Sequence, residues 1–153
     1  MEPVAGSTAS AITVREAALG DACDVATLLD ALGYPCTREE AGDRILHVRQ
    51  DPRQHLLIAE IDGMACGLAA LDVRLSITRG ADLARINALV VSPRCTGQGI
   101  GRRLLREVEG IARRAGAVRI EVTASGAREG AHAFYHCCGF SDGSQHLIKR
   151  LGD

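Results

Sequence analysis

Apolar and polar residues alternate near the start of the chain, in "AITVREA" at residues 11–17, and this period of two predicts a strand. The next segment, "DACDVATLLDALG", has apolar residues at helical spacing. It predicts a helix that is capped by Asp21 and ends at Gly33. A second helix is expected from a cap at Thr37 to about residue 49.

Two apolar segments then follow, "HLLIAEI" at residues 55–61 and "MACGLAALDVRL" at residues 64–75. Asp-Gly is a strong signal for a tight β-turn, so the Asp62-Gly63 pair between them predicts a hairpin. The polar segment "SITRGADLA", residues 76–84, is expected to be a loop. The segment "RINALVV", residues 85–91, predicts a strand that is buried on both faces.

One helix has a clear apolar stripe and is expected over Ile100–Ala115, with Gly116 as its end. After it we expect a strand at residues 118–124, a short helix at 129–139 and a last strand at 144–151. The order is then β-α-α-β-β-β-α-β-α-β. The fold class is therefore α/β (α+β), with a mixed central sheet flanked by helices.

Composition limits the class of protein without changing this fold. The chain has 153 residues, of which 46% are hydrophobic and 24% charged, which is typical of one globular domain. We expect a flexible tail at residues 1–10 and a single domain at 11–153. A net charge of −1 gives no general reason to bind nucleic acid or an anionic membrane. The sequence leaves open a local basic patch at Arg102, Arg103 and Arg106.

The N-terminal segment "MEPVAGSTAS" has no basic or apolar region of the secretory kind, so a cytoplasmic location is expected. The chain has six cysteines but no C-x-x-C pair, which favours free thiols in a reducing compartment and no metal site. Cys95 lies beside a glycine-rich segment, where exposure would make it the thiol to watch for reactivity.

That glycine-rich segment, "SPRCTGQGIGRRLL", has glycines at Gly97, Gly99 and Gly101 between a predicted strand and a predicted helix. A strand, a glycine turn and a helix together direct backbone N–H groups at one place, which favours an anion site. The spacing does not match the dinucleotide fingerprint G-x-G-x-x-G or the phosphate loop G-x-x-x-x-G-K-[ST]. On this segment alone, a turn that only packs a helix against a strand is an equal alternative.

The wider segment from Ala88 to Phe140 resembles the core of the GNAT superfamily of N-acetyltransferases. In that family the end of a strand leads into R-G-x-G-I-G, and a second motif, A-x-x-F-Y-x-x-x-G-F, follows a helix and a strand. The segment "AHAFYHCCGF", residues 131–140, matches the second motif at the same spacing. The matching residues are Ala131, Phe134, Tyr135, Gly139 and Phe140. The resemblance extends over most of the chain.

This resemblance implies acetyl-CoA as the cosubstrate and no metal, with two central strands of the sheet splayed apart. The end of the strand, Leu89, Val90 and Val91, would pair with the pantetheine arm as an added strand does. The turn would bind the pyrophosphate of coenzyme A. The residues assigned to the turn are Thr96, Gly97, Gln98, Gly99, Ile100, Gly101 and Arg102.

Two positions depart from the family pattern. Thr96 stands where an arginine or glutamine is usual, which removes one charged phosphate contact unless Arg94 or Arg102 replaces it. Arg128 stands where an asparagine is frequent. It is assigned to cofactor binding because an arginine there can contact a phosphate, and a solvated arginine is the equal alternative.

The resemblance also implies catalytic roles. Tyr135 matches the family tyrosine that donates a proton to the departing thiolate. Glu121 matches a glutamate that is a base in some relatives, and the sequence leaves open whether it faces the site or solvent. Asn87 stands where other relatives have a glutamate, and an amide cannot act as a base. His132, like the lone His47 and His55, is not assigned a role.

The expected function is transfer of an acetyl group from acetyl-CoA to the primary amine of a small molecule or peptide. Alternatives are acetylation of protein N-termini or lysines, and a catalytically silent module that senses acyl-CoA. A homodimer is compatible with the resemblance. The acceptor segments show no recognisable pattern; the residues that they offer are Tyr34, Glu39, Glu40, Arg74 and Asp82.

Overall fold

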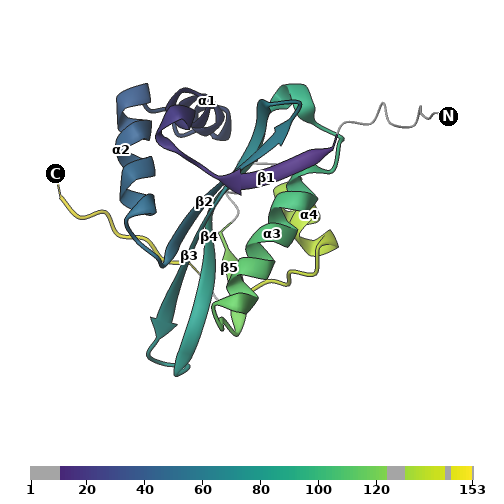
Figure 1. Cartoon of the computed structure of the whole chain (residues 1–153). Coiled ribbons are helices and arrows are strands. Elements are labelled where there is room, and N and C mark those ends of the chain that lie inside the picture. Colours follow the sequence, from purple (N-terminus) through teal and green to yellow (C-terminus); the bar gives the residue numbers. More distant parts are fainter. Residues whose placement is uncertain (1–10, 124–129, 144–145, 153) are drawn as a thin grey trace. The chain divides into compact units, whose positions relative to one another are not determined.

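The computed structural model describes residues 11–123, 130–143 and 146–152. The chain divides after Thr123 into two compact units, and each is described by itself. The tail expected at residues 1–10 lies outside the described residues. The elements in chain order (Figure 1) are β1 (Ile12–Glu16), η2 (Leu19–Asp21), α1 (Ala22–Leu32), α2 (Arg38–Arg49), β2 (Gln54–Ile61), β3 (Met64–Ser76), β4 (Ala81–Val91), η3 (Pro93–Cys95), α3 (Ile100–Arg114), β5 (Arg119–Val122) and α4 (Ala131–Cys137).

The first unit is built on a five-stranded sheet in the order β1-β2-β3-β4-β5. The first four strands are antiparallel neighbours, whereas β4 and β5 are parallel. Helix α3 makes the connection between these two parallel strands, as a parallel pair requires a crossover. The sheet is therefore mixed, as the sequence predicts.

Helices cover both faces of this sheet (Figure 1). Helices α1 and α2 pack against one face of the sheet. Together they form a buried cluster that includes Val25, Ile45, Leu68 and Val90. The apolar stripe of α3 packs on the other face, since a Cβ at Gly67 of β3 would lie 2.9 Å from the Ile100 side chain and 3.0 Å from that of Leu104. The buried residues of α3 are Ile100, Leu104, Leu105, Val108 and Ala112.

Local signals in the sequence account for most element boundaries. The Thr37 hydroxyl accepts from the Glu40 N–H at 3.0 Å and the Glu40 carboxylate accepts from the Thr37 N–H at 2.8 Å, which is a capping box. Gly33 ends α1 in the left-handed conformation. Asp62 and Gly63 both have positive φ, at 53° and 77°, as a tight hairpin turn requires.

The loop expected at residues 76–84 is wrong. Strand β3 extends to Ser76 and β4 begins at Ala81, so only residues 77–80 connect them. Gly80, with φ of 64°, allows the turn, and its N–H donates to the Ser76 carbonyl at 2.8 Å. The polar residues here do not show the alternation typical of a strand. The strand still forms, because its backbone hydrogen bonds with β3 do not depend on the side chains.

The last strand expected at residues 144–151 is also absent from the residues that the structure describes there, 146–151. Leu147, Ile148 and Leu151 of this segment are exposed. A strand needs a neighbour for its backbone hydrogen bonds, and no described strand pairs with this segment.

The second unit contains α4, which begins after Gly130 and is seven residues long. The ring of Tyr135 makes edge contacts with Phe134 and Phe140, at centroid distances of 5.3 Å each. The predicted short helix is therefore confirmed. Across both units, the described helices include none that is long and apolar enough to cross a membrane.

Candidate functional site

The glycine turn between β4 and α3 has the backbone conformation that only glycine adopts readily. Gly97 and Gly99 have φ of 81° and 79°, and Gly99 is the residue that caps α3. An added Cβ at either position would find no atom within 4 Å, so the space next to this backbone is open. Gly101 lies in the first turn of α3 itself. The glycines are therefore required by conformation at Gly97 and Gly99.

The N-terminus of α3 presents backbone donors that no described residue accepts from. The first hydrogen bond of the helix runs from the Arg103 N–H to the Gly99 carbonyl at 3.0 Å. The N–H groups of the preceding residues 97–102 have no acceptor among the described residues. No described side chain caps the helix, and its first turn has no acidic residue. This region is suited to an anion.

The basic patch expected next to this turn is smaller than the sequence indicates. Arg103 donates to the Ile12 carbonyl at 2.8 Å and pairs with Glu107 at 2.9 Å. Arg102 and Arg106 are exposed and have no ion-pair partner in the described part of the chain. Cys95, considered above for its exposure, is only 7% exposed, because η3 turns it inward. It is therefore not an accessible thiol in this structure.

One edge of β4 has no described partner where the strand approaches the turn. Strand β5 pairs only with Leu83–Ile86, and β4 continues to Val91 with no described partner on that edge. Val90 is buried, whereas Leu89 and Val91 are half-buried. The pairing between β3 and β4 shifts between Ala70 and Leu71, which leaves Asn87 as an extra residue of a bulge. In the described residues the β4–β5 pairing therefore stops before the glycine turn, as the predicted splay of the two central strands requires.

Polar side chains lie across the sheet next to this splay. Gln54 of β2, Asp72 of β3, Arg85 of β4 and Glu121 of β5 are successive partners in the strand register. Partners in register share a face, so we call these four residues the polar row. Side chains alternate along β3, so Asp72 lies on the same face of the sheet as Leu68. Helices α1 and α2 cover this face around Leu68.

Asp72 is the buried carboxylate of this row. Its Oδ2 accepts from Asn87 Nδ2 at 3.0 Å and from Arg74 at 3.3 Å. Arg74 Nε also lies 3.3 Å from Oδ1, but without hydrogen-bond geometry, so this buried oxygen has no donor among the described residues. A buried acceptor without a donor costs free energy, and a further donor would be stabilised here. Asp72 and Arg85 are not among the site residues predicted from the sequence.

Glu121 belongs to the same face as Asp72, and it is half-buried. Its carboxylate pairs with Arg119 Nε at 3.2 Å. Arg85, its partner in register, contacts the Thr123 hydroxyl at 3.4 Å and has no carboxylate within ion-pair distance among the described residues. The row therefore offers one arginine without a charged partner.

Comparison with known proteins identifies the family. The sequence profile of the acetyltransferase (GNAT) family matches residues 25–140. The chain belongs to the GNAT family. It is 31% identical over 124 residues, 81% of this chain and 78% of the relative, to an aminoalkylphosphonate N-acetyltransferase of Salmonella typhimurium.

Solved structures show the same GNAT fold. A transcriptional regulator from Bacillus halodurans matches with a TM-score of 0.85 and 21% identity, over 92% of this chain and all of that chain (100%). A GNAT family acetyltransferase from Staphylococcus aureus matches with a TM-score of 0.78 and 21% identity, over 92% of this chain and 98% of that chain. The mixed α/β fold with flanking helices is therefore confirmed.

The remaining GNAT motif residues lie in the second unit or outside the described residues. Tyr135 is half-buried on α4. Arg128 lies outside the described residues. His132 on α4 is exposed, as is His47 on α2. His55 is half-buried and its Nδ1 lies 3.9 Å from a carboxylate oxygen of Glu16.

The acceptor residues considered from the sequence are not brought together. Tyr34 is exposed, Glu40 is used in the capping box, and Asp82 pairs with Arg53 at 3.2 Å. Only Arg74 lies next to the polar row, through its contact with Asp72.

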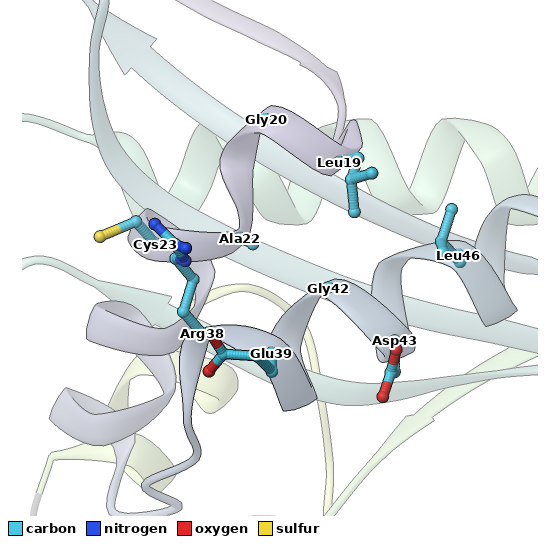
Figure 2. Close-up of a pocket in the computed structure, with 9 residues that line it drawn as sticks. All are labelled: Leu19, Gly20, Ala22, Cys23, Arg38, Glu39, Gly42, Asp43 and Leu46. Atoms are coloured by element: carbon cyan, nitrogen blue, oxygen red, sulfur yellow. The ribbon is translucent and has the colours of Figure 1, made fainter.

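Glu39 lines a separate hollow of about 410 Å³ between η2, α1 and α2 (Figure 2). Figure 2 shows Cys23 and Arg38 toward one end of this hollow and Leu19 and Leu46 toward the other. None of its lining residues belongs to the sheet or the glycine turn. We therefore assign the hollow no part in the site.

Proposed function

We propose that this protein is an N-acetyltransferase that moves an acetyl group from acetyl-CoA directly to the primary amine of a small molecule. The observation that carries the proposal is a run of N–H groups at residues 97–102 without acceptors among the described residues, next to the end of β4 that has no described partner on one edge. The first feature suits the pyrophosphate of coenzyme A and the second suits the amides of its pantetheine arm.

The residues of this chain have distinct tasks in that proposal. The amides of Gly97–Arg102 bind the pyrophosphate, and the exposed guanidinium of Arg102 adds the charge that Thr96 does not supply. Leu89–Val91 pair with the pantetheine amides, and an N–H near Leu89 polarises the thioester carbonyl. Arg128 is assigned a contact with a phosphate.

Acetyl-CoA supplies the activated acetyl group as a thioester. The amine nitrogen forms the new bond to the carbonyl carbon as the carbon–sulfur bond breaks. Tyr135 gives its phenolic proton to the departing thiolate, and Glu121, directly or through a water, takes the proton that the amine loses. Both groups are then restored by exchange with solvent.

We further propose that the acceptor is an amine with an anionic group elsewhere in the molecule. Arg85 supports this class, because it is an exposed cation without a carboxylate partner among the described residues. Asp72 and Glu121 on the same face favour the ammonium group. The similar Salmonella protein is named for an aminoalkylphosphonate, which has both groups.

A thiol-release assay tests the function. The wild-type protein is given acetyl-CoA with an aminoalkylphosphonate, a matched alkylamine without phosphonate, a lysine peptide and a peptide with a free N-terminus. We expect the highest kcat/KM with the aminoalkylphosphonate. Faster acetylation of either peptide would mean that the protein acetylates proteins and not a small molecule. Tight acetyl-CoA binding with no thiol release from any amine would support the acyl-CoA sensor.

A further inference from the structure

A cluster of three metal-ligating side chains lies on and just after α4. His132 and His136 are four residues apart, so they project from one face of the helix, and Asp142 follows the helix. One ligand atom of each residue lies within 4.8 Å of the others, and all three side chains are exposed. This H-x₃-H pair was not recognised from the sequence, because such a spacing was considered only as the partner of a C-x-x-C pair.

The geometry is close to that of a metal site. At metal–ligand bonds of about 2.1 Å, the ligand atoms of a tetrahedral ion are roughly 3.4 Å apart. His136 Nε2 and Asp142 Oδ1 are 3.0 Å apart, and the two imidazole rings have centroids 6.2 Å apart in an edge arrangement. Exposed side chains can close the remaining gap of about 1.4 Å by rotation, since no packed core holds them.

We propose that His132, His136 and Asp142 bind a divalent transition-metal ion, with Zn²⁺ as the physiological candidate. Two imidazoles and one carboxylate form a donor set that suits Zn²⁺ better than Mg²⁺ or Ca²⁺, which prefer oxygen ligands. Three protein ligands leave a further position for water. The ion joins α4 to the segment that follows it and thereby stabilises this part of the second unit.

A plain hydrogen bond between His136 and Asp142 is the competing explanation of the cluster. That pair would exist without His132, whereas a metal site requires all three ligands. Vicinal Cys137 and Cys138 are a second competitor, since both are free thiols next to the cluster and thiolates bind Zn²⁺.

The test is calorimetric titration of Zn²⁺ into the full chain, without an affinity tag and after treatment with a chelator. We expect one site in the wild type and at least a tenfold loss of affinity in each of His132→Ala, His136→Ala and Asp142→Asn. Two controls should retain wild-type affinity: His47→Ala, an exposed histidine on another helix, and the double variant Cys137→Ser/Cys138→Ser.

Three results would overturn the proposal. They are no Zn²⁺ binding by the wild type, retention of affinity in His132→Ala, and loss of affinity in the double cysteine variant, which would make the thiols the ligands. Absorption of bound Co²⁺ gives a second readout: a spectrum without the strong band of thiolate ligation supports histidine and carboxylate ligands. The measurement is of binding, so it does not depend on acetyl transfer.

Discussion

In the proposed function, the glycine turn before α3 and the polar row of β2–β5 each bind an anion, but with different groups. The turn uses backbone N–H groups of residues 97–102, which have no acceptor among the described residues. The polar row uses the Arg85 guanidinium, which the strand register places between Asp72 and Glu121. The binding proposed at the turn therefore depends on backbone conformation, and the binding proposed at the row depends on side-chain identity and register.

The proposed proton donor, Tyr135, should affect the rate of the chemical step and not the binding at either region. Tyr135→Phe keeps the ring and its contacts with Phe134 and Phe140 and removes the proton donor. We expect kcat to fall about 10²–10⁴-fold with unchanged affinity for acetyl-CoA and for the amine. Tyr34→Phe, the same change at an exposed residue, is the matched control. Undiminished kcat, measured where chemistry limits the rate, would remove Tyr135 from the mechanism.

The turn is tested by a change of backbone conformation alone. Gly99→Val forces a β-branched residue to a φ of 79°, which strains or rearranges the turn. We expect at least a tenfold loss of coenzyme A affinity, or about 1.4 kcal/mol. Gly116→Val imposes the same strain at a φ of 84° after the other end of α3, and it should keep the affinity. Equal losses in the two folded variants, measured by calorimetry, would contradict the assignment.

The polar row is tested by removing its arginine. Arg85→Ala should raise KM for an anionic amine about tenfold, because a hydrogen bond between charged groups is lost. KM for an amine without the anion and the affinity for coenzyme A should not change. Arg79→Ala, at an exposed arginine in the turn between β3 and β4, is the control. An equal rise in KM for both kinds of amine would show that Arg85 does not recognise the anion.

The smallest effect concerns Cys66, whose thiol is buried. Its backbone carbonyl accepts a hydrogen bond from the Ser92 N–H, just before the turn. Burial, with a contribution from Cys95, raises the pKa of the Cys66 thiol from 9.0 to about 11. The folded state then keeps a proton that the unfolded state loses, so folding stability falls as pH rises from 9 to 11. We expect Cys66→Ala to flatten this dependence in urea unfolding, and Cys23→Ala, an exposed thiol, to leave it unchanged. A slope that persists in Cys66→Ala would assign it to another group.

The turn was predictable from the sequence because its conformation restricts the residue type. Gly97 and Gly99 stand where φ is positive, and the caps at Thr37 and Gly33 follow the same kind of local rule. Such rules act within a few residues, so they can be recognised in a short segment.

The polar row was not predictable, since it is assembled by strand register. Asp72 and Arg85 are partners only because the bulge at Asn87 shifts the pairing of β3 with β4. The extension of β4 back to Ala81 was missed for a related reason, as its backbone ladder imposes no pattern on the side chains. His132 and His136 have a recognisable spacing, but the third member, Asp142, comes from beyond the helix.

The central claim is that the donor site is made by backbone N–H groups at the turn and the unpaired end of β4. The most direct test is a titration of ¹⁵N-labelled protein with coenzyme A, followed by NMR of the backbone amides. We predict the largest shift changes at Gly97–Arg102 and Leu89–Val91, and little change along the polar row until an anionic amine is added. Saturable changes confined to other residues, such as those around the hollow between α1 and α2, would contradict the account.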